Sequence, residues 1–161
     1  MSKTDSRKES CYTIRMRKGL IPAIVHVTTL CVVVFAVSAY FVYDDGRIGY
    51  ALVVLGLFCL WSVKLFGIPI ASLGPDIVFG VIDNGVLAVM AVFGGRIAGV
   101  PGAIIGGVVG NALTDGIAGI FEGYWAESLI SDKRTILGSA VGKMAGCLLG
   151  AGLVLIVLGH L

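Results

Sequence analysis

The chain has 161 residues, of which 57% are hydrophobic and 14% are charged, and its mean hydropathy is +0.98. A soluble domain of this size carries about a quarter charged residues, so the composition excludes a water-soluble fold for most of the chain. The net charge of +2 is small, and no aromatic or glycine pattern accompanies the basic residues, which argues against nucleic-acid binding. The sequence therefore predicts an all-α integral membrane protein, because a helix satisfies its own backbone groups in lipid.

Along the chain, we expect residues 1–18 to form a basic cytoplasmic tail and residues 19–161 to form a single transmembrane helical domain. The lysines and arginines that precede the first apolar run predict a cytoplasmic N-terminus by the positive-inside rule. We expect a multi-pass protein that lies in the inner cell membrane. The expected spans are residues 20–43, 48–66, 75–93, 103–125 and 135–158, and residues 67–102 leave room for a broken or re-entrant helix instead of a simple span.

Glycine recurs at every fourth position along two of the expected spans. Lipid supplies no hydrophobic force between helices, so small residues pack helices together by letting their backbones approach closely. The spacing predicts two helix-packing faces, a tight bundle and a homo-oligomer contact. The glycines on these faces are Gly102, Gly106 and Gly110 in the fourth span and Gly138, Gly142, Gly146 and Gly150 in the fifth.

Acidic and amide side chains also occur inside the expected spans. A carboxylate at the membrane centre costs about 2.5–3.5 kcal/mol on the insertion scale, so Asp83 and Asp115 each need a compensating partner. The third and fourth spans are antiparallel neighbours, and both acids are expected side by side in the inner half of the bilayer. Helical periodicity puts Asn111, Asp115 and Glu122 on one face. The predicted cation-binding or pathway residues are Asp76, Asp83, Asn84, Asn111, Asp115 and Glu122.

Lys143 in the fifth span leaves the role of these acids open, because it is expected at a depth similar to that of Asp83 and Asp115. As their charge partner it would form a buried ion pair that holds three helices in register. Two other roles remain open for the acids. They form a cation site or pathway, or they are protonated groups without a transport role. Carboxylate and amide oxygens suit Mg²⁺, Mn²⁺ and Fe²⁺, whereas the absence of a nearby His or Cys disfavours zinc and copper.

The segment that spans about residues 75–127 carries a pattern that resembles that of the vacuolar iron transporter family. In that family an Asn, an Asp four residues later and a Glu-Tyr element follow each other on the second helix, and an Asp-Gly element lies on the preceding helix. The matching residues here are Asn111, Asp115, Glu122 and Tyr124 in the fourth span and Asp83-Asn84-Gly85 in the third.

Proteins of that family are five-span dimers that exchange divalent iron or manganese for protons. The resemblance therefore implies metal-coupling roles for Asp83, Asp115 and Glu122. The chain differs from the family pattern in four features. Two spans precede the Asp-Gly helix, and the spacing from the Asp to the Glu is one residue short. Ile117-Ala118-Gly119 stands where the family has a serine-methionine pair, and residues 126–134 hold no counterpart of the acidic cytoplasmic metal-binding domain.

Two functions are compatible with these features. The first is a small membrane transporter or channel for a cation, either a divalent metal such as Fe, Mn or Mg or the proton, with the cation as substrate and no certain cofactor. The alternative is a non-catalytic structural or accessory subunit of a larger membrane complex or of a homo-oligomeric assembly. An enzyme is not expected, because the sequence offers no nucleophile–base pair, histidine cluster or phosphate loop.

Overall fold

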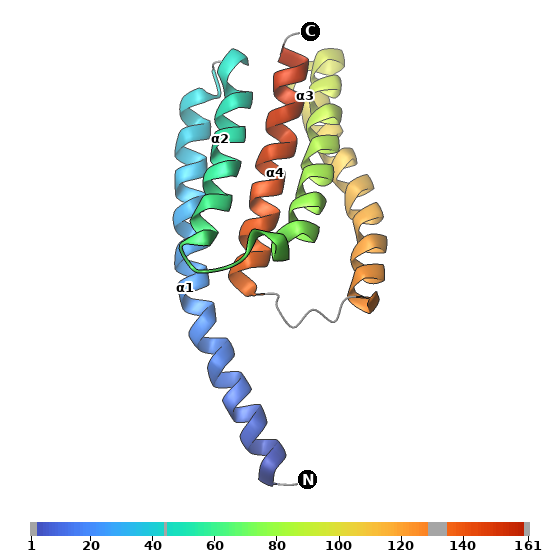
Figure 1. Ribbon diagram of the computed structural model, residues 1–161. Coiled ribbons are helices and arrows are strands. Elements are labelled where there is room, and N and C mark those ends of the chain that lie inside the picture. The colour runs from blue at the N-terminus through green and yellow to red at the C-terminus, as the bar shows by residue number, and fades with distance from the viewer. Residues whose placement is uncertain (1–2, 44, 129–134, 160–161) are drawn as a thin grey trace.

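The protein is a bundle of helices (Figure 1). The computed structural model describes the backbone of residues 3–43, 45–128 and 135–159, and the side chains of residues 20–43, 46–117 and 135–158. Within these ranges the elements are α1 (Lys3–Phe41), α2 (Asp45–Lys64), the short 3-10 helix η1 (Ile70–Leu73), α3 (Gly74–Ser128) and α4 (Ile136–Gly159).

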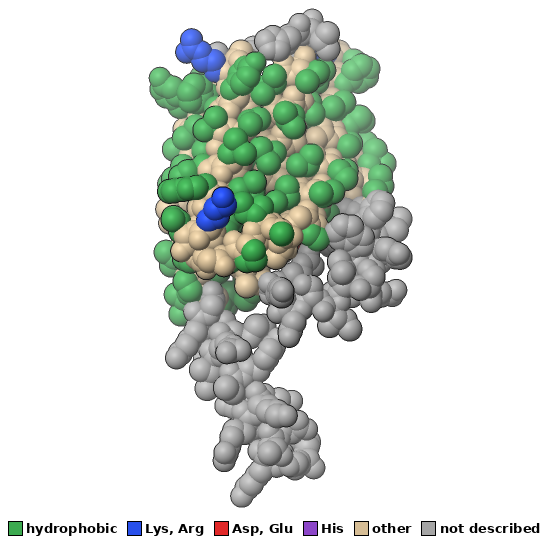
Figure 2. Space-filling view, viewed as in Figure 1, with side chains coloured by type: hydrophobic (Ala, Val, Ile, Leu, Met, Phe, Trp, Pro, Cys, Tyr) green, Lys and Arg blue, Asp and Glu red, His purple; other side chains and the backbone are tan. Residues whose placement is uncertain are grey.

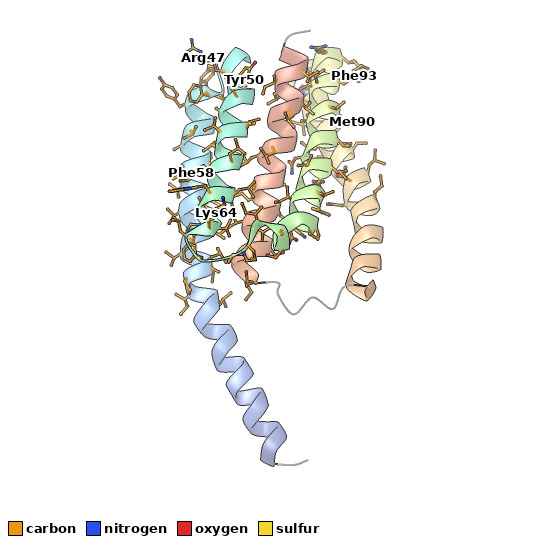
Figure 3. All side chains as sticks on the ribbon, in the orientation of Figure 1. Arg47, Tyr50, Phe58, Lys64, Met90 and Phe93 are labelled. Atoms are coloured by element: carbon orange, nitrogen blue, oxygen red, sulfur yellow. The ribbon has the colours of Figure 1, made fainter. Side chains whose placement is uncertain are left out.

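Four stretches of the described chain are long and apolar enough to cross a membrane: Leu20–Phe41, Gly46–Lys64, Ile70–Ile117 and Ile136–Leu158. Hydrophobic side chains cover the face seen in Figure 2, and few Lys and Arg side chains interrupt them. Two cations bracket an apolar helix in Figure 3, where Arg47 lies at one end of α2 and Lys64 toward the other. The predicted all-helical fold, with helices long and apolar enough to cross a membrane, is confirmed for the described residues.

The first helix is longer than its predicted span. It begins at Lys3, so the backbone of the predicted tail continues into the apolar part of α1 without a break. Pro22 lies inside this helix, where it removes one backbone hydrogen bond. The side chains of the basic cluster lie outside the described residues.

The long helix α3 consists of two arms, which we call the first arm (residues 74–97) and the second arm (residues 100–128). The backbone leaves the helical region at Ala98 (φ −134°, ψ 19°) and Gly99 (φ 62°, ψ −144°). The positive φ of Gly99 is a conformation that glycine adopts without a steric penalty. The predicted connection over residues 94–102 is therefore shorter than expected, and helix continues through most of it.

The two arms run antiparallel and pack against each other from the turn, where Gly94 meets Gly102, to the contact of Asp83 with Thr114. A methyl group added at Gly106 would lie 2.1 Å from the carbonyl oxygen of Met90, and one added at Gly110 would lie 2.9 Å from Cα of Leu87. At the turn, a methyl group on Gly94 would lie 2.1 Å from the carbonyl oxygen of Gly102. Side chains at these glycines would push the arms apart, so the tight turn depends on them.

Helix α4 lies at the centre of the bundle, between α2 and the first arm (Figure 1). Methyl groups added at Gly146 and Gly150 would lie 2.2 Å and 2.3 Å from the carbonyl oxygens of Ile77 and Val81 on the first arm. On the other side of α4, a methyl group on Gly152 would lie 2.8 Å from the carbonyl oxygen of Gly49 in α2. Backbone contact on both sides makes α4 the element that joins the two halves of the bundle.

A polar contact ties α1 to α2. The hydroxyl of Ser62 donates to the carbonyl of Cys59 at 2.7 Å, and Nε2 of His26 lies 3.0 Å from the same hydroxyl oxygen. Because Ser62 has only one hydrogen to donate, Nε2 of His26 is the donor in this contact. The His26 ring also packs edge-on against Phe66, with 4.7 Å between ring centroids. His26 therefore acts as a packed side chain between helices.

The contact between α4 and the first arm can be tested with two glycine-to-alanine changes. Gly146→Ala puts a methyl group 2.2 Å from a backbone oxygen, so we expect a loss of roughly 1–3 kcal/mol in unfolding free energy. Gly85→Ala is the control, because nothing lies within 4 Å of its added methyl group. That change should be neutral or stabilising, since alanine is the better helix former. Thermal unfolding in detergent micelles measures both, and equal midpoints would contradict the packing described.

Candidate cation site

Asp83 forms the centre of a polar cluster between the two arms of α3. Its side chain is 9% exposed, and Thr114 on the second arm, 2% exposed, donates its hydroxyl to Oδ1 of Asp83. The amide of Asn84 approaches Oδ2 of the same carboxyl group at 3.4 Å. The second arm adds two backbone acceptors, because Oγ1 of Thr114 lies 3.0 Å from the carbonyl oxygens of both Gly110 and Asn111. The cluster is thus an oxygen-rich site around one buried carboxyl group.

The glycine spacing explains why Thr114 faces Asp83. Gly102, Gly106 and Gly110 occupy every fourth position on the side of the second arm that meets the first arm, and Thr114 is the next residue in that series. Residues four apart lie on one helix face, so the same packing that buries the glycines brings the Thr114 hydroxyl to Asp83.

Asp115 does not lie beside Asp83, contrary to the sequence prediction. It is exposed on another face of the second arm, where Asn111, also exposed, donates its amide to Oδ2 of Asp115 at 2.8 Å. A single residue step turns a helix by about 100°, so Asp115 points away when Thr114 points inward. The predicted grouping of Asn111 with Asp115 is found, but this pair is separate from the Asp83 cluster.

Asp76 marks the end of the first arm nearest η1. Its side chain is 1% exposed, and Ser139 of α4 donates its hydroxyl to Oδ1 at 3.0 Å. Asp76 lies in the first turn of α3, where the helix dipole stabilises a negative charge. Seven residues separate it from Asp83, a rise of about 10 Å on the same helix. Two buried carboxyl groups therefore follow each other along the first arm.

Lys143 lies on α4 between the levels of these two acids, since it is four residues beyond Ser139. Its Nζ lies 4.5 Å from the centroid of the Phe79 ring, a cation–π contact that stabilises an ammonium group away from water. One helical turn further along α4, Cys147 lies next to the Asn84 amide. The Phe79 ring on the first arm is thus one contact of Lys143, and its role as a charge partner of Asp83 or Asp115 stays a prediction.

Two predicted features cannot be placed in this cluster. Glu122 belongs to the helical backbone of the second arm, but its side chain lies outside the described residues. Among the side chains that are described, no group of three or more His, Cys, Asp or Glu residues is arranged to hold a metal ion. The described carboxyl groups lie at separate positions.

The sequence analysis did not select Thr114 or Ser139 as site residues. The signal for Thr114 was present, because it extends the glycine series of the second arm by one step. Ser139 gave no comparable signal, since it becomes relevant only when α4 packs on the first arm at the observed register.

No family model, characterised protein or solved structure matches the chain. The likeness to vacuolar iron transporters therefore remains a resemblance in the residues of the third and fourth spans. The site has to be interpreted from its own geometry.

The hydroxyl of Thr114 can be tested with a substitution that keeps its shape. Thr114→Val removes the donor to a buried carboxyl group, so we expect unfolding free energy to fall by roughly 1–3 kcal/mol. Thr114→Ser keeps the hydroxyl and should retain most of the stability. Thr29→Val is the matched control, because the Thr29 hydroxyl bonds only the Val25 carbonyl of its own helix, 2.9 Å away, on an exposed face. Denaturation in micelles measures all three, and equal losses for Thr114→Val and Thr29→Val would contradict the assignment.

Proposed function

We propose that the protein is a small membrane carrier or channel for a cation, the proton included, and that Asp83 is the carboxyl group that binds it. The observation that carries this proposal is the burial of Asp83 between two apolar helical arms, with a hydroxyl group and an amide group directed at it. Ionisable groups at membrane depth are expensive, and they typically mark ion pathways or proton relays.

The hydrogen bonds around Thr114 allow Asp83 to exist in two charge states. When Asp83 is ionised, the Thr114 hydroxyl donates to it. When Asp83 is protonated, the carboxyl group donates to Oγ1 of Thr114, and the Thr114 hydrogen turns to the Gly110 carbonyl 3.0 Å away. Each state leaves the buried groups satisfied, which a site that takes up and releases a proton requires.

The ligands also suit a hard metal cation. Most donors around Asp83 are carboxylate, hydroxyl, carbonyl and amide oxygen atoms, which Mg²⁺, Ca²⁺ and Mn²⁺ prefer over sulfur or imidazole, and the Cys147 thiol next to Asn84 is a sulfur atom near this group. One carboxylate supplies little charge, so such a site would bind weakly and release readily, as transport requires. Asp76 with Ser139 would form a second step of the same pathway, one level nearer the η1 end.

The proposed topology has five membrane crossings with a cytoplasmic N-terminus. Each arm of α3 has more than the roughly 20 residues that a crossing requires, and the arms run in opposite directions. The basic residues before Leu20 favour a cytoplasmic N-terminus, and an inner cell membrane is the location that we propose. Asp83 would then lie about 14 Å from the cytoplasmic start of the first arm.

The decisive experiment is cation flux into proteoliposomes that contain the purified full chain, measured for protons and for a panel of divalent cations. We expect Asp83→Asn to lower the flux at least about tenfold, because the variant lacks the titratable group and the negative charge. Asp115→Asn makes the same chemical change on the outer face of the second arm and should retain most of the flux.

Folding controls decide how the result is interpreted. Both variants should first elute as the native chain does on size exclusion. A folded Asp83→Asn protein with native flux would reject the proposed site. Absence of flux for every cation in the native protein would favour the alternative of a structural membrane subunit.

A further inference from the structure

The outer face of the second arm carries a polar pair at membrane depth. Asn111 and Asp115 are hydrogen-bonded to each other at 2.8 Å and are both exposed. Two apolar neighbours on this face, Ile104 and Val108, are 61% and 65% exposed. Lipid tails offer no hydrogen-bond partner, so this surface is costly to leave against the bilayer.

These four residues have the spacing of a helix-pairing seam. The steps from Ile104 to Val108, to Asn111 and to Asp115 are four, three and four residues, which is the heptad pattern of two helices that wrap around each other. The sequence continues the same spacing at Ala118 and Glu122. We call the face formed by Ile104, Val108, Asn111 and Asp115 the outer seam.

We propose that a second copy of this chain docks on the outer seam, with the two second arms parallel and a two-fold axis along the membrane normal. Copies inserted in the same orientation present parallel arms, and a two-fold axis pairs each position with itself. Asn111 is self-complementary, because its amide both donates and accepts. Two facing Asp115 carboxyl groups are satisfied when they share protons, and each accepts from its own Asn111.

A second copy fits this seam better than other occupants. The first arm packs on the glycine face, so the outer seam lies on a different side of the second arm. Helix α1 packs against α2 and α4 at the far side of the bundle, so the chain's own first helix does not cover the seam. The seam is polar at Asn111 and Asp115 and apolar at Ile104 and Val108, a pattern that an identical helix matches position by position.

The outer seam is independent of the proposed ion site. Thr114, which donates to Asp83, belongs to the glycine face, whereas Asp115 belongs to the seam. Failure of one proposal would therefore leave the other standing, and the experiments separate them because one measures flux and the other measures association.

Disulfide trapping in native membranes tests the seam directly. In a full chain with Cys11 and Cys31 replaced by Ser, Ile104→Cys puts a thiol on the seam, and Ile105→Cys puts one on the adjacent face. The two positions are 61% and 63% exposed and differ by one residue in depth, so accessibility is matched. Mild oxidation should give covalent dimers for Ile104→Cys and no more than the parent background for Ile105→Cys.

A second measurement examines the polar pair. Single-molecule photobleaching of labelled protein in supported bilayers gives the dimer fraction as a function of surface density. We expect Asn111→Val to weaken association about three- to tenfold, the range for one interhelical hydrogen bond in lipid, with no change for Thr29→Val on α1.

Three results would overturn the proposal. They are equal trapping at both cysteine positions, single-step bleaching of the native chain at every density, and a different protein recovered in stoichiometric amount that cross-links to the cysteine at position 104.

Discussion

The close approach of α4 to the first arm of α3 determines the positions of the polar side chains in this bundle. In lipid, helices gain little from burying apolar surface, so association depends on packing at short range. Gly146 and Gly150 let the α4 backbone reach the carbonyl groups of Ile77 and Val81, and contacts between Cα–H groups and carbonyl oxygens become possible at that distance. The register fixed there sets Ser139 against Asp76 and Lys143 over Phe79.

The same principle acts on the second arm and determines which of its polar residues enters the bundle. Gly106 and Gly110 face the first arm, and the series ends at Thr114, whose hydroxyl is small enough to fit at a glycine-packed contact. An aspartate at position 114 would put two carboxyl groups together. The observed arrangement instead gives Asp83 a neutral partner, and it leaves Asp115 for the outside of the arm.

Much of this could be predicted from the sequence, because glycine spacing and apolar length are local properties. The helical membrane fold and the pairing of Asn111 with Asp115 follow from periodicity alone. The partner of Asp83 did not follow, since two stripes one residue apart, Gly110–Thr114 and Asn111–Asp115, both had helical spacing. The sequence does not say which of the two stripes faces the first arm, because estimates of depth in the membrane carry no information about rotation around the helix axis. In the structure, close backbone contact at the glycines determines that rotation, and pairing of the two carboxyl groups does not. The position of Ser139 depends on the register of two helices distant in sequence, which no local pattern encodes.

The bundle is asymmetric across its width, and this asymmetry relates the two proposals. On one side, α1 presents apolar residues such as Ile21, Val32 and Phe35 outward, as a lipid-facing helix does. On the other side, the second arm presents a carboxyl group and an amide group outward at membrane depth. Asp83 lies behind that arm and takes its hydroxyl partner from the same chain, so the proposed cation site needs no residue from a second copy. Pairing along the outer seam would then bring two such sites into one assembly and leave the Thr114 contact of each unchanged, because Thr114 and Asp115 lie on different faces of the second arm.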